Sequence, residues 1–574
     1  PPSPTFQTLS MLIVYKVVEY LEGRSKHRLD LDVNTHNKLK VALVPLLSVS
    51  EHWRRAALES ICDTCALDFD QPYETRKIVF PAWPTDFKHT RLCKTNLVKR
   101  AVFPATLGRT VVDRMADEGI RWLQRRGVVA PNAKTMLLCL RKAVNHAASP
   151  DNNPTPASAP TSTTEQQSLA LFARYLLRMV PSVTGITVFI PSIDAVQSEL
   201  LQMYGSLIST LCRGRVKALY AYSVQGTIPI SLNFLGVSGL TSIANGVNIA
   251  CAQFAQLIFR NSRTLKTINF RFVAESNWRD MIYGHTQTPT VYTHLTTLAL
   301  TIIGIPYNTT WTAIDDIAPF PALSTLDVSD RYPFDDDLLF RGNGRTMKNL
   351  HLPFRAIARN ILARFNILKR SGISRMNSFS IDAIYYEDIV FMANRVDVII
   401  RQQVHHILET TTKFSIAKDI ADRPSTKIFK AIELAPSTSI LQHLDFGISG
   451  VVYITGVIKL INALPTLVIL TCHLGDLGLV DKVAPESTYP SSLRSTNYPL
   501  SKSFRLLRVH HASTASACTI AKISMIVAIA CPNFTHVDMA PELRNAFSRE
   551  IAWGTCNRPF EPYADSIRRL IYKD

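Results

Sequence analysis

The chain has 574 residues, of which 47% are hydrophobic and 19% charged, and its formal net charge is +18. This apolar content excludes a disordered chain, and the lack of an unbroken apolar run of roughly 20 residues excludes a polytopic membrane protein. The basic excess favours an acidic partner, either a nucleic acid or an acidic protein face. The ten cysteines are scattered along the chain, which argues against a disulfide framework and favours a reducing compartment, cytoplasmic or nuclear.

Residues 1–65 are predicted to form a helical unit. Apolar residues recur at every third or fourth position across residues 9–21, which predicts an amphipathic helix that ends at Gly23. A second apolar stripe covers residues 39–57, and Pro45 is expected to divide it because proline cannot donate a helical hydrogen bond. The sequence therefore predicts an all-α segment at the start of the chain.

The rest of the chain divides into three parts by composition. Residues 66–145 either connect the helical unit to the later parts of the chain or form a first irregular repeat region. Residues 146–168 are rich in Pro, Ser, Thr and Ala and have no apolar periodicity, so they are predicted to be a flexible linker or a loop. Residues 169–574 are predicted to be a repeat array with a C-terminal cap.

Beyond residue 168 one arrangement returns twelve times, a helical stretch followed by a short segment h-x-x-h-x-h in which h is apolar. Most copies start 24–37 residues apart, and an interval of 49 residues between Val216 and Leu265 leaves room for one degenerate copy. In four copies a proline stands two places before the first h, where the preceding helix must end. The copies begin at Val183, Val216, Leu265, Leu295, Leu323, Met347, Met376, Thr411, Leu441, Leu467, Phe504 and Phe534.

One helix and one strand cannot bury their apolar faces alone, whereas stacked neighbours form one continuous core. The pattern resembles the leucine-rich repeat family in its longer strand-plus-helix form. The resemblance implies an α/β solenoid with a parallel sheet on the concave side, helices outside and the N-terminal all-α unit as a cap. The chain departs from the family because it mostly lacks the Asn or Cys expected three residues after the last h.

Residues 46–57, with the sequence LLSVSEHWRRAA, resemble the second half of an F-box, and residues 9–21 would supply its first helix. In that family the helices bind the Skp-type adaptor of a cullin–RING ubiquitin ligase, and the repeats behind them select the substrate. The chain departs from the motif at Leu9-Ser10, where Leu-Pro is usual, and in the long charged loop over residues 22–38. A plain helical cap for the first repeat is the alternative. The resemblance implies adaptor contacts through Leu12, Ile13, Val17, Leu21, Leu46, Leu47, Val49 and Trp53.

The candidate catalytic and metal-binding motifs are all incomplete. Cys62 and Cys65 form a lone C-x-x-C pair, whereas a structural zinc site needs four ligands. The neighbours His510 and His511 are expected to point to opposite faces of a strand, which makes them poor chelates. No nucleophile stands at a recognisable spacing from a base. We therefore expect no enzymatic activity, no cofactor and no metal in this chain.

If the repeats stack, the x positions of each strand face outward on the concave side and form columns across the sheet. Aromatic and arginine side chains are the usual anchors of protein interfaces. The clustering of four His with Asp and Arg near the C-terminus predicts binding that changes between roughly pH 5.5 and 7.5. The predicted substrate-binding residues are Tyr220, Tyr222, Asn269, Arg271, His351, His443, Asp445, His473, Arg508, His510, His536 and Asp538.

The sequence therefore predicts a non-enzymatic protein-binding receptor, and more specifically the substrate-recognition subunit of a cullin–RING (SCF-type) ubiquitin ligase. The alternative is a repeat scaffold or sensor that holds a protein ligand without any link to a ligase. A nucleic-acid binder is a third hypothesis, motivated by the charge of +18, but the mixed sign of the predicted columns argues against it. No membrane partner is expected.

Overall fold

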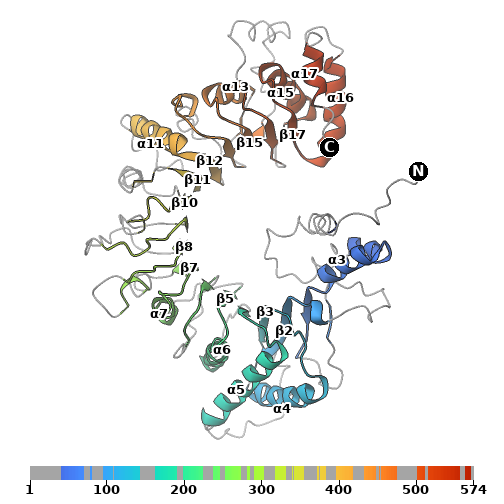
Figure 1. Ribbon diagram of the computed structural model, residues 1–574, viewed down its shortest axis with the longest axis vertical. Helices are drawn as coiled ribbons and strands as arrows, with labels where there is room; N and C mark the ends of the chain where they lie inside the picture. Colours follow the sequence, from blue (N-terminus) through green and yellow to red (C-terminus); the bar gives the residue numbers. More distant parts are fainter. Residues whose placement is uncertain are drawn as a thin grey trace, which may run out of the picture. The chain divides into compact units, whose positions relative to one another are not determined.

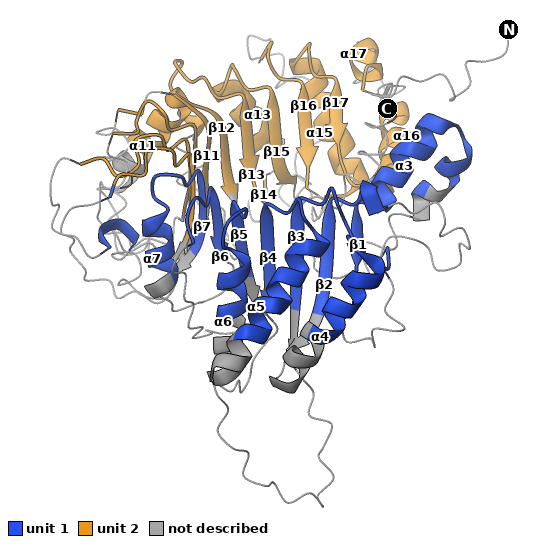
Figure 2. Ribbon diagram, turned by 60° about the horizontal axis from the view of Figure 1, so that its bottom comes forward, with its two compact units in different colours: residues 1–290 blue, residues 291–574 orange. Residues whose placement is uncertain are grey.

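A computed structural model of the chain divides into two compact units, unit 1 (Pro1–Thr290) and unit 2 (Val291–Asp574), which are coloured separately in Figure 2. The structure describes residues 14, 41–69, 78–80, 95–107, 109–142, 162–190, 198–223, 237–245, 252–272, 281–284, 290–302, 317–330, 339, 342–353, 372–373, 375–382, 396–417, 432–447, 451–452, 454–474, 501–510, 515–555 and 563–570.

Unit 1 opens with two helical segments and continues as strands and helices. Pro45 lies inside the first segment, which is a 3-10 helix, and an α-helix begins after Ser50. In chain order the elements are η2 (Val41–Ser48), α3 (Glu51–Ile61), β1 (Thr64–Ala66), η4 (Thr95–Leu97), β2 (Arg100–Leu107), α4 (Arg109–Arg126), β3 (Thr135–Lys142), α5 (Ser162–Met179), β4 (Gly185–Ile190), α6 (Ser198–Leu211), β5 (Ala218–Ser223), β6 (Ser242–Asn245), α7 (Ala252–Arg260) and β7 (Thr267–Phe272).

The strands of unit 1 form a parallel sheet in which neighbours in sequence are neighbours in space. Each strand from β1 to β6 pairs with the strand that follows it, and every one of these pairs is parallel. Helices α4, α5, α6 and α7 cover the same face of the sheet (Figures 1 and 2). The opposite face carries none of these four helices.

Unit 2 repeats this plan and ends in a helical cap. In chain order its elements are β8 (Thr297–Ile302), β9 (Thr325–Asp330), β10 (Asn349–Pro353), β11 (Met376–Asp382), α11 (Val396–Thr410), β12 (Thr411–Ala417), β13 (His443–Phe446), β14 (Val451–Val452), α13 (Ile454–Ala463), β15 (Ile469–Leu474), β16 (Leu506–Val509), α15 (Ala517–Ala530), β17 (His536–Asp538), η8 (Pro541–Leu543), α16 (Arg544–Thr555) and α17 (Ala564–Arg568). Strands β8 to β13 pair in order, and β15, β16 and β17 continue from β13, all parallel. The short β14 pairs with the end of β15.

The apolar positions of the repeats form the core between the sheet and the helices. In the repeat that contains β7, Leu265, Ile268 and Phe270 have no exposed surface, and the ring of Phe254 from α7 lies 5.9 Å from that of Phe270. The predicted fold class, an α/β solenoid with a parallel sheet, outer helices and an all-α N-terminal unit, is confirmed. No described helix combines the length and the apolar character that crossing a lipid bilayer requires.

The parallel sheet starts earlier than residue 169, the start of the array predicted from the sequence. Cys62, Cys65 and Leu67 are buried h positions around β1, and Ala133 and Met136 are buried h positions around β3. These copies are less conspicuous in the sequence because Cys fills two of the three h positions around β1 and Ala133 fills the first h position around β3. The two cysteines of the lone C-x-x-C pair thus occupy the first two h positions of a first repeat.

The structure changes one further predicted boundary and fills one interval that the sequence left open. Helix α5 begins at Ser162, inside the predicted linker 146–168, because its first turn uses the polar residues of that segment. The interval of 49 residues between Val216 and Leu265 does contain a degenerate repeat. Its strand is β6, where Leu240 and Ile243 are buried and a polar residue, Asn245, takes the third h position.

Threonine hydroxyls join successive repeats. Thr264, Thr346 and Thr466 each stand directly before the first h of their repeat. Each hydroxyl donates to the carbonyl of the first h of the preceding repeat, at 2.7–2.8 Å. These hydrogen bonds connect neighbouring turns, the role that the missing Asn or Cys would have in regular leucine-rich repeats.

Candidate functional site

The helical cap, formed by η2 and α3, is built around a buried tryptophan. Trp53 is 2% exposed and belongs to one apolar cluster with Val14, Leu43, Leu47 and Ile61, among others. The guanidinium of Arg54 donates from Nε to the carbonyl of Leu47 at 2.8 Å, which fixes α3 against η2. Trp53 and Leu47 therefore pack inside the cap.

The predicted adaptor-binding residues fall into three groups. Leu47 and Trp53 lie in the interior of the cap, whereas Leu46 and Val49 are partly buried at the rim of the same cluster. Their part in binding an adaptor stays a prediction, and the rim pair is the one that a partner can reach. The other four predicted contacts lie outside the described residues: Leu12, Ile13, Val17 and Leu21.

Polar residues on the exposed side of α3 were not among the predicted contacts. Glu51, His52 and Arg55 are exposed, and Arg55 pairs with Glu59 one turn later at 3.1 Å. Their positions between the buried residues of an amphipathic helix are the signal that could have found them.

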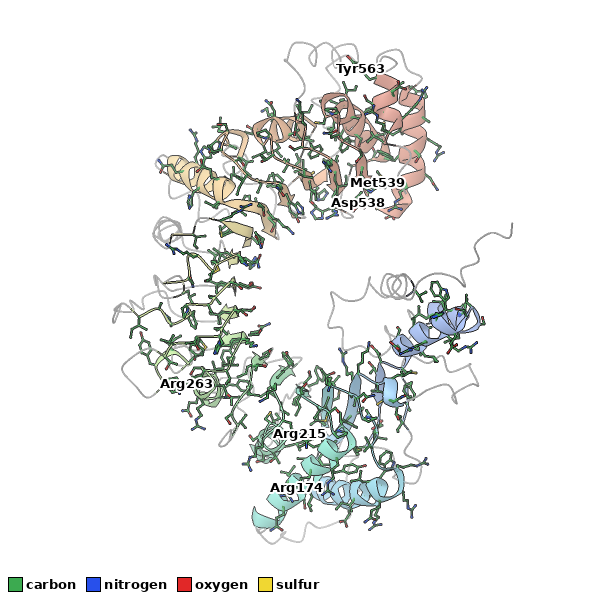
Figure 3. The ribbon with its side chains drawn as sticks, viewed as in Figure 1. Arg174, Arg215, Arg263, Asp538, Met539 and Tyr563 are labelled. Atoms are coloured by element: carbon green, nitrogen blue, oxygen red, sulfur yellow. The ribbon has the colours of Figure 1, made fainter. Side chains whose placement is uncertain are left out.

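The open face of unit 2 carries a row of polar side chains across five neighbouring strands. Strand register places Ser415, Asp445, Thr471, Arg508 and Asp538 beside one another on β12, β13, β15, β16 and β17. Figure 3 marks Asp538 at the end of this row. We define the polar row as Lys413, Ser415, His443, Asp445, Thr471, Arg508, His510, His536 and Asp538.

Side-chain contacts connect the strands of the polar row. The Arg508 guanidinium donates from Nε to Asp538 Oδ2 at 3.0 Å, joining β16 to β17. The His443 Nε2 atom lies 3.1 Å from Thr471 Oγ1, which joins β13 to β15. Arg508 and Asp538 are roughly half exposed, so this ion pair contributes at most about 1 kcal/mol to stability and is available to a partner.

Asp445 and His510 face each other without completing a hydrogen bond. Asp445 Oδ1 and His510 Nε2 lie 3.4 Å apart, both atoms are buried, and neither has a hydrogen-bond partner among the described residues. A buried polar atom without a partner costs about 1–3 kcal/mol. The pair is thus a point in the polar row whose polar groups the described residues leave incompletely satisfied.

The charge of His443 depends on its neighbours in the row. Burial lowers the pKa of His443 from its ordinary value of 6.5, Lys413 and Arg508 lower it further, and Asp445 opposes them. The neutral ring is therefore the favoured form in the folded chain near neutral pH. In that form one ring nitrogen of His443 can accept a hydrogen bond from a partner.

Replacing His443 by Gln is expected to reduce the loss of stability on acidification. Because the folded state disfavours protonation of His443, the unfolded chain takes up this proton first as the pH falls below 6.5, and the folded state loses stability there. Urea unfolding of unit 2 between about pH 7.5 and 5 measures the effect. The matched control Ser415→Ala removes a side chain of the same row that does not titrate in this range, so it should keep the wild-type pH dependence. Identical slopes for wild type and His443→Gln would contradict the prediction.

The remaining predicted substrate-binding residues are spread over strands of both units. The hydroxyl of Tyr220 lies 3.1 Å from Ser242 Oγ on the next strand, and Asn269 is exposed on β7. His351 Nε2 stands 3.9 Å from Asp327 Oδ1 in unit 2. His473 is 8% exposed, so little of its side chain is accessible.

Strand register sets Tyr222 opposite Phe189, but the side chains of Tyr222 and Arg271 lie outside the described set. The predicted residues thus meet in one place, the polar row, which contains His443, Asp445, Arg508, His510, His536 and Asp538. Their role in binding a substrate stays a prediction.

The cysteines of the C-x-x-C pair are buried core residues. Cys62 is 0% and Cys65 1% exposed, and burial raises the pKa of Cys65 to about 12. A thiol that stays protonated at neutral pH is neither a nucleophile nor a metal ligand. Over the described ranges, no three His, Cys, Asp or Glu side chains are grouped so that they could hold a metal ion.

Comparisons with known proteins add little to this geometry. No family model matches the chain. No curated protein matches its sequence. Among solved structures, the chain is similar to one described as the crystal structure of the Rad7 and Elc1 complex in yeast, with a TM-score of 0.27 and 9% sequence identity over 94% of each chain. A TM-score of this size carries no argument, so the functional conclusions rest on the residues of the cap and the polar row.

Proposed function

We propose that this chain is a non-enzymatic protein-binding receptor, and that it serves as the substrate-recognition subunit of a cullin–RING ubiquitin ligase. The observation that carries the proposal is the polar row, an accessible line of His, Asp and Arg side chains on a sheet face that no described helix of unit 2 covers. The F-box-like sequence of the cap adds the link to a ligase.

The two surfaces have separate tasks in this proposal. The rim of the helical cap, at Leu46 and Val49, binds a Skp-type adaptor, as the resemblance to the F-box implies. The polar row holds a protein substrate, to which the half-exposed side chains of Arg508 and Asp538 offer accessible charges. The chain contributes proximity, because tethering a substrate raises its effective concentration near the ubiquitin-carrying enzyme.

A scaffold or sensor without a ligase link is the second candidate. The polar row supports it equally, because that surface binds a protein in either case. The cap distinguishes the two functions, since a pure scaffold needs it only to cover the first repeat.

Co-purification with a Skp-type adaptor tests the proposal. The wild-type chain is expected to form a 1:1 complex, and Leu46→Asp combined with Val49→Asp is expected to weaken it at least about tenfold, because charged groups would be desolvated at the interface. Leu97→Asp is the matched control, since Leu97 is partly buried against the same cluster but belongs to η4 outside the F-box-like segment.

The control separates loss of binding from loss of folding. If Leu97→Asp keeps the complex and the rim variant loses it, the rim is the adaptor-binding surface. If wild type and both variants stay folded and none binds an adaptor, the ligase link is wrong and the scaffold function replaces it. Circular dichroism of each purified chain establishes that it is folded.

A further inference from the structure

The turns that lead from helix to strand in unit 1 share one charge. Because all strands of the sheet are parallel, these turns meet at one edge, the edge where the strands begin. The five turns cover residues 123–135, 177–185, 211–218, 237–242 and 259–267, and none contains Asp or Glu. They carry ten Lys or Arg residues, all exposed: Arg125, Arg126, Lys134, Arg178, Arg213, Arg215, Lys217, Arg260, Arg263 and Lys266.

The backbone fixes the spacing of this edge. The residue before each strand accepts two hydrogen bonds from the next repeat: the carbonyl of Lys134 accepts from Thr184 and Gly185 at 2.9 Å, and that of Lys217 accepts from Thr241 and Ser242. Lys99, Lys134 and Lys217 occupy this position, as do Thr184 and Thr241 between them, whereas Asp63 holds it before β1. Lys266 is the residue directly before β7. We define the basic edge as the ten residues of the turns together with Lys99 and the exposed Arg100.

Side chains of the basic edge are held along it. The Lys217 ammonium lies 3.2 Å from the position that a Cβ atom of Gly239 would occupy, so it reaches across the next turn. Gly239 has φ +77, a conformation in which a side chain is strained, and its lack of a side chain leaves room for this ammonium. The Arg215 guanidinium donates from Nη1 to the carbonyl of Pro181 at 3.0 Å, which fixes it to the preceding turn. Arg215 and Arg263 are marked in Figure 3.

We propose that the basic edge of unit 1 binds the phosphate backbone of a nucleic acid duplex. From β2 to β7 the edge spans five strand steps, roughly 24 Å at the usual strand spacing of about 4.8 Å. A nucleic acid strand presents about seven phosphates over that length, at about 3.4 Å each. The charge of the basic edge is therefore opposite to that of a phosphate backbone, and its length covers several consecutive phosphates.

A duplex fits this edge better than a single strand or a membrane surface. Single-stranded nucleic acid is usually held by exposed aromatic side chains that stack on its bases, and the five turns carry one aromatic residue, Phe259, which is half-buried. Membrane surfaces usually require apolar side chains that insert beside the basic ones. Of the large exposed apolar residues in the described part of the chain, Val128 alone lies in these turns.

The basic edge is a different place from the one where the sequence argued against nucleic acid. The mixed charges of the columns argue against a nucleic-acid partner on the sheet face. This argument does not apply to the edge where the strands begin. The basic edge runs along the ends of the strands of unit 1, whereas the polar row belongs to the strands of unit 2. The inference does not depend on the proposed ligase function.

Fluorescence anisotropy with a labelled duplex of about 20 base pairs tests the proposal on the full chain. Wild type is expected to bind at about 50 mM salt and to lose affinity steeply as salt increases, because binding releases counterions. The edge variant Lys134→Glu, Lys217→Glu, Lys266→Glu should lower the affinity at least about 30-fold and flatten the slope of log affinity against log salt by about 3.

The control variant is Arg544→Glu, Arg549→Glu, Arg569→Glu, which makes the same change in net charge at exposed positions of unit 2. It should change the affinity less than about threefold. Equal losses in the two variants would show an effect of net charge alone and would overturn the proposal, as would the absence of wild-type binding at low salt. Binding to anionic phospholipid vesicles or to polyglutamate that depends on the edge, without edge-dependent binding of the duplex, would also overturn it.

Discussion

Replacing Trp53 by Ala is expected to lower the free energy of unfolding of the helical cap by about 3–5 kcal/mol, the usual cost of truncating a buried aromatic residue. Trp53 is 2% exposed and packs inside the cluster that holds η2 against α3. Because repeat proteins lose local structure without unfolding as a whole, the measurement is hydrogen exchange of the α3 amides.

The matched control is Arg55→Ala on the same helix. The Arg55 side chain is 69% exposed and forms an exposed ion pair with Glu59 one turn away, so its loss is expected to cost less than about 0.5 kcal/mol. If exchange in α3 is equally protected in Trp53→Ala and Arg55→Ala, Trp53 does not hold the cap together. The expected result also shows that Trp53 variants cannot separate adaptor binding from folding.

Replacing Asn261 by Leu is expected to destabilise the repeats around β6 and β7 by about 2–3 kcal/mol. Asn261 is 2% exposed, its Oδ1 accepts from the backbone amide of Leu240 at 3.0 Å, and its Nδ2 donates to the carbonyl of Leu257 at 2.8 Å. Leucine has a similar size but leaves the buried Leu240 amide without an acceptor, which carries the full cost of desolvation.

Asn343 provides the control because it stands at the same position of its own repeat, four residues before the first h. It is fully buried and donates to the carbonyl of Leu339, but its Oδ1 accepts no hydrogen bond among the described residues. Asn343→Leu is therefore expected to cost less than Asn261→Leu. Hydrogen exchange of the strand amides in each variant measures both costs, and a larger loss at Asn343 would contradict the account.

The repeat architecture could be predicted because it depends on local spacing. The spacing of apolar residues and the proline that follows a helix are both signals contained within one repeat. As predicted, α13 and α15 end two residues before Pro465 and Pro532. The repeat around β1 was missed, and residues 66–145, which hold β2 and β3, were left open between a connection and a first irregular repeat region. Cysteine is a common metal ligand, so the residue type of Cys62 and Cys65 suggests a metal site. Their positions in the h-x-x-h-x-h pattern, with Leu67 as the third h, identify them as core residues instead.

The connections between repeats were less accessible from the sequence. Thr264 and Asn261 are polar residues in a turn, and only stacking on the preceding repeat brings them within hydrogen-bond distance of the backbone of Leu240. The same limit applies to the candidate surfaces. The approach of Asp445 to His510 joins residues 65 positions apart across an intervening strand, and a search for motifs does not see it.

The basic edge illustrates a different limit. Its charges occur singly or in pairs, so no run of basic residues marks them in the sequence. Parallel pairing brings the turns of successive repeats to the same edge of the sheet. A periodic position, the residue before each strand, was the available signal, and it lies outside the three apolar positions used to find the repeats.

The measurement that tests the central claim most directly is ubiquitin transfer in a reconstituted reaction containing the chain, a Skp-type adaptor, a cullin–RING pair and the ubiquitin-activating and ubiquitin-conjugating enzymes. The account predicts adaptor-dependent transfer of ubiquitin to lysines of the chain itself, because a docked receptor holds its surface lysines near the charged enzyme. Transfer should persist in Leu97→Asp and be lost in the variant that combines Leu46→Asp with Val49→Asp. If the folded wild-type chain receives no ubiquitin in the presence of the adaptor, the ligase-receptor function is contradicted.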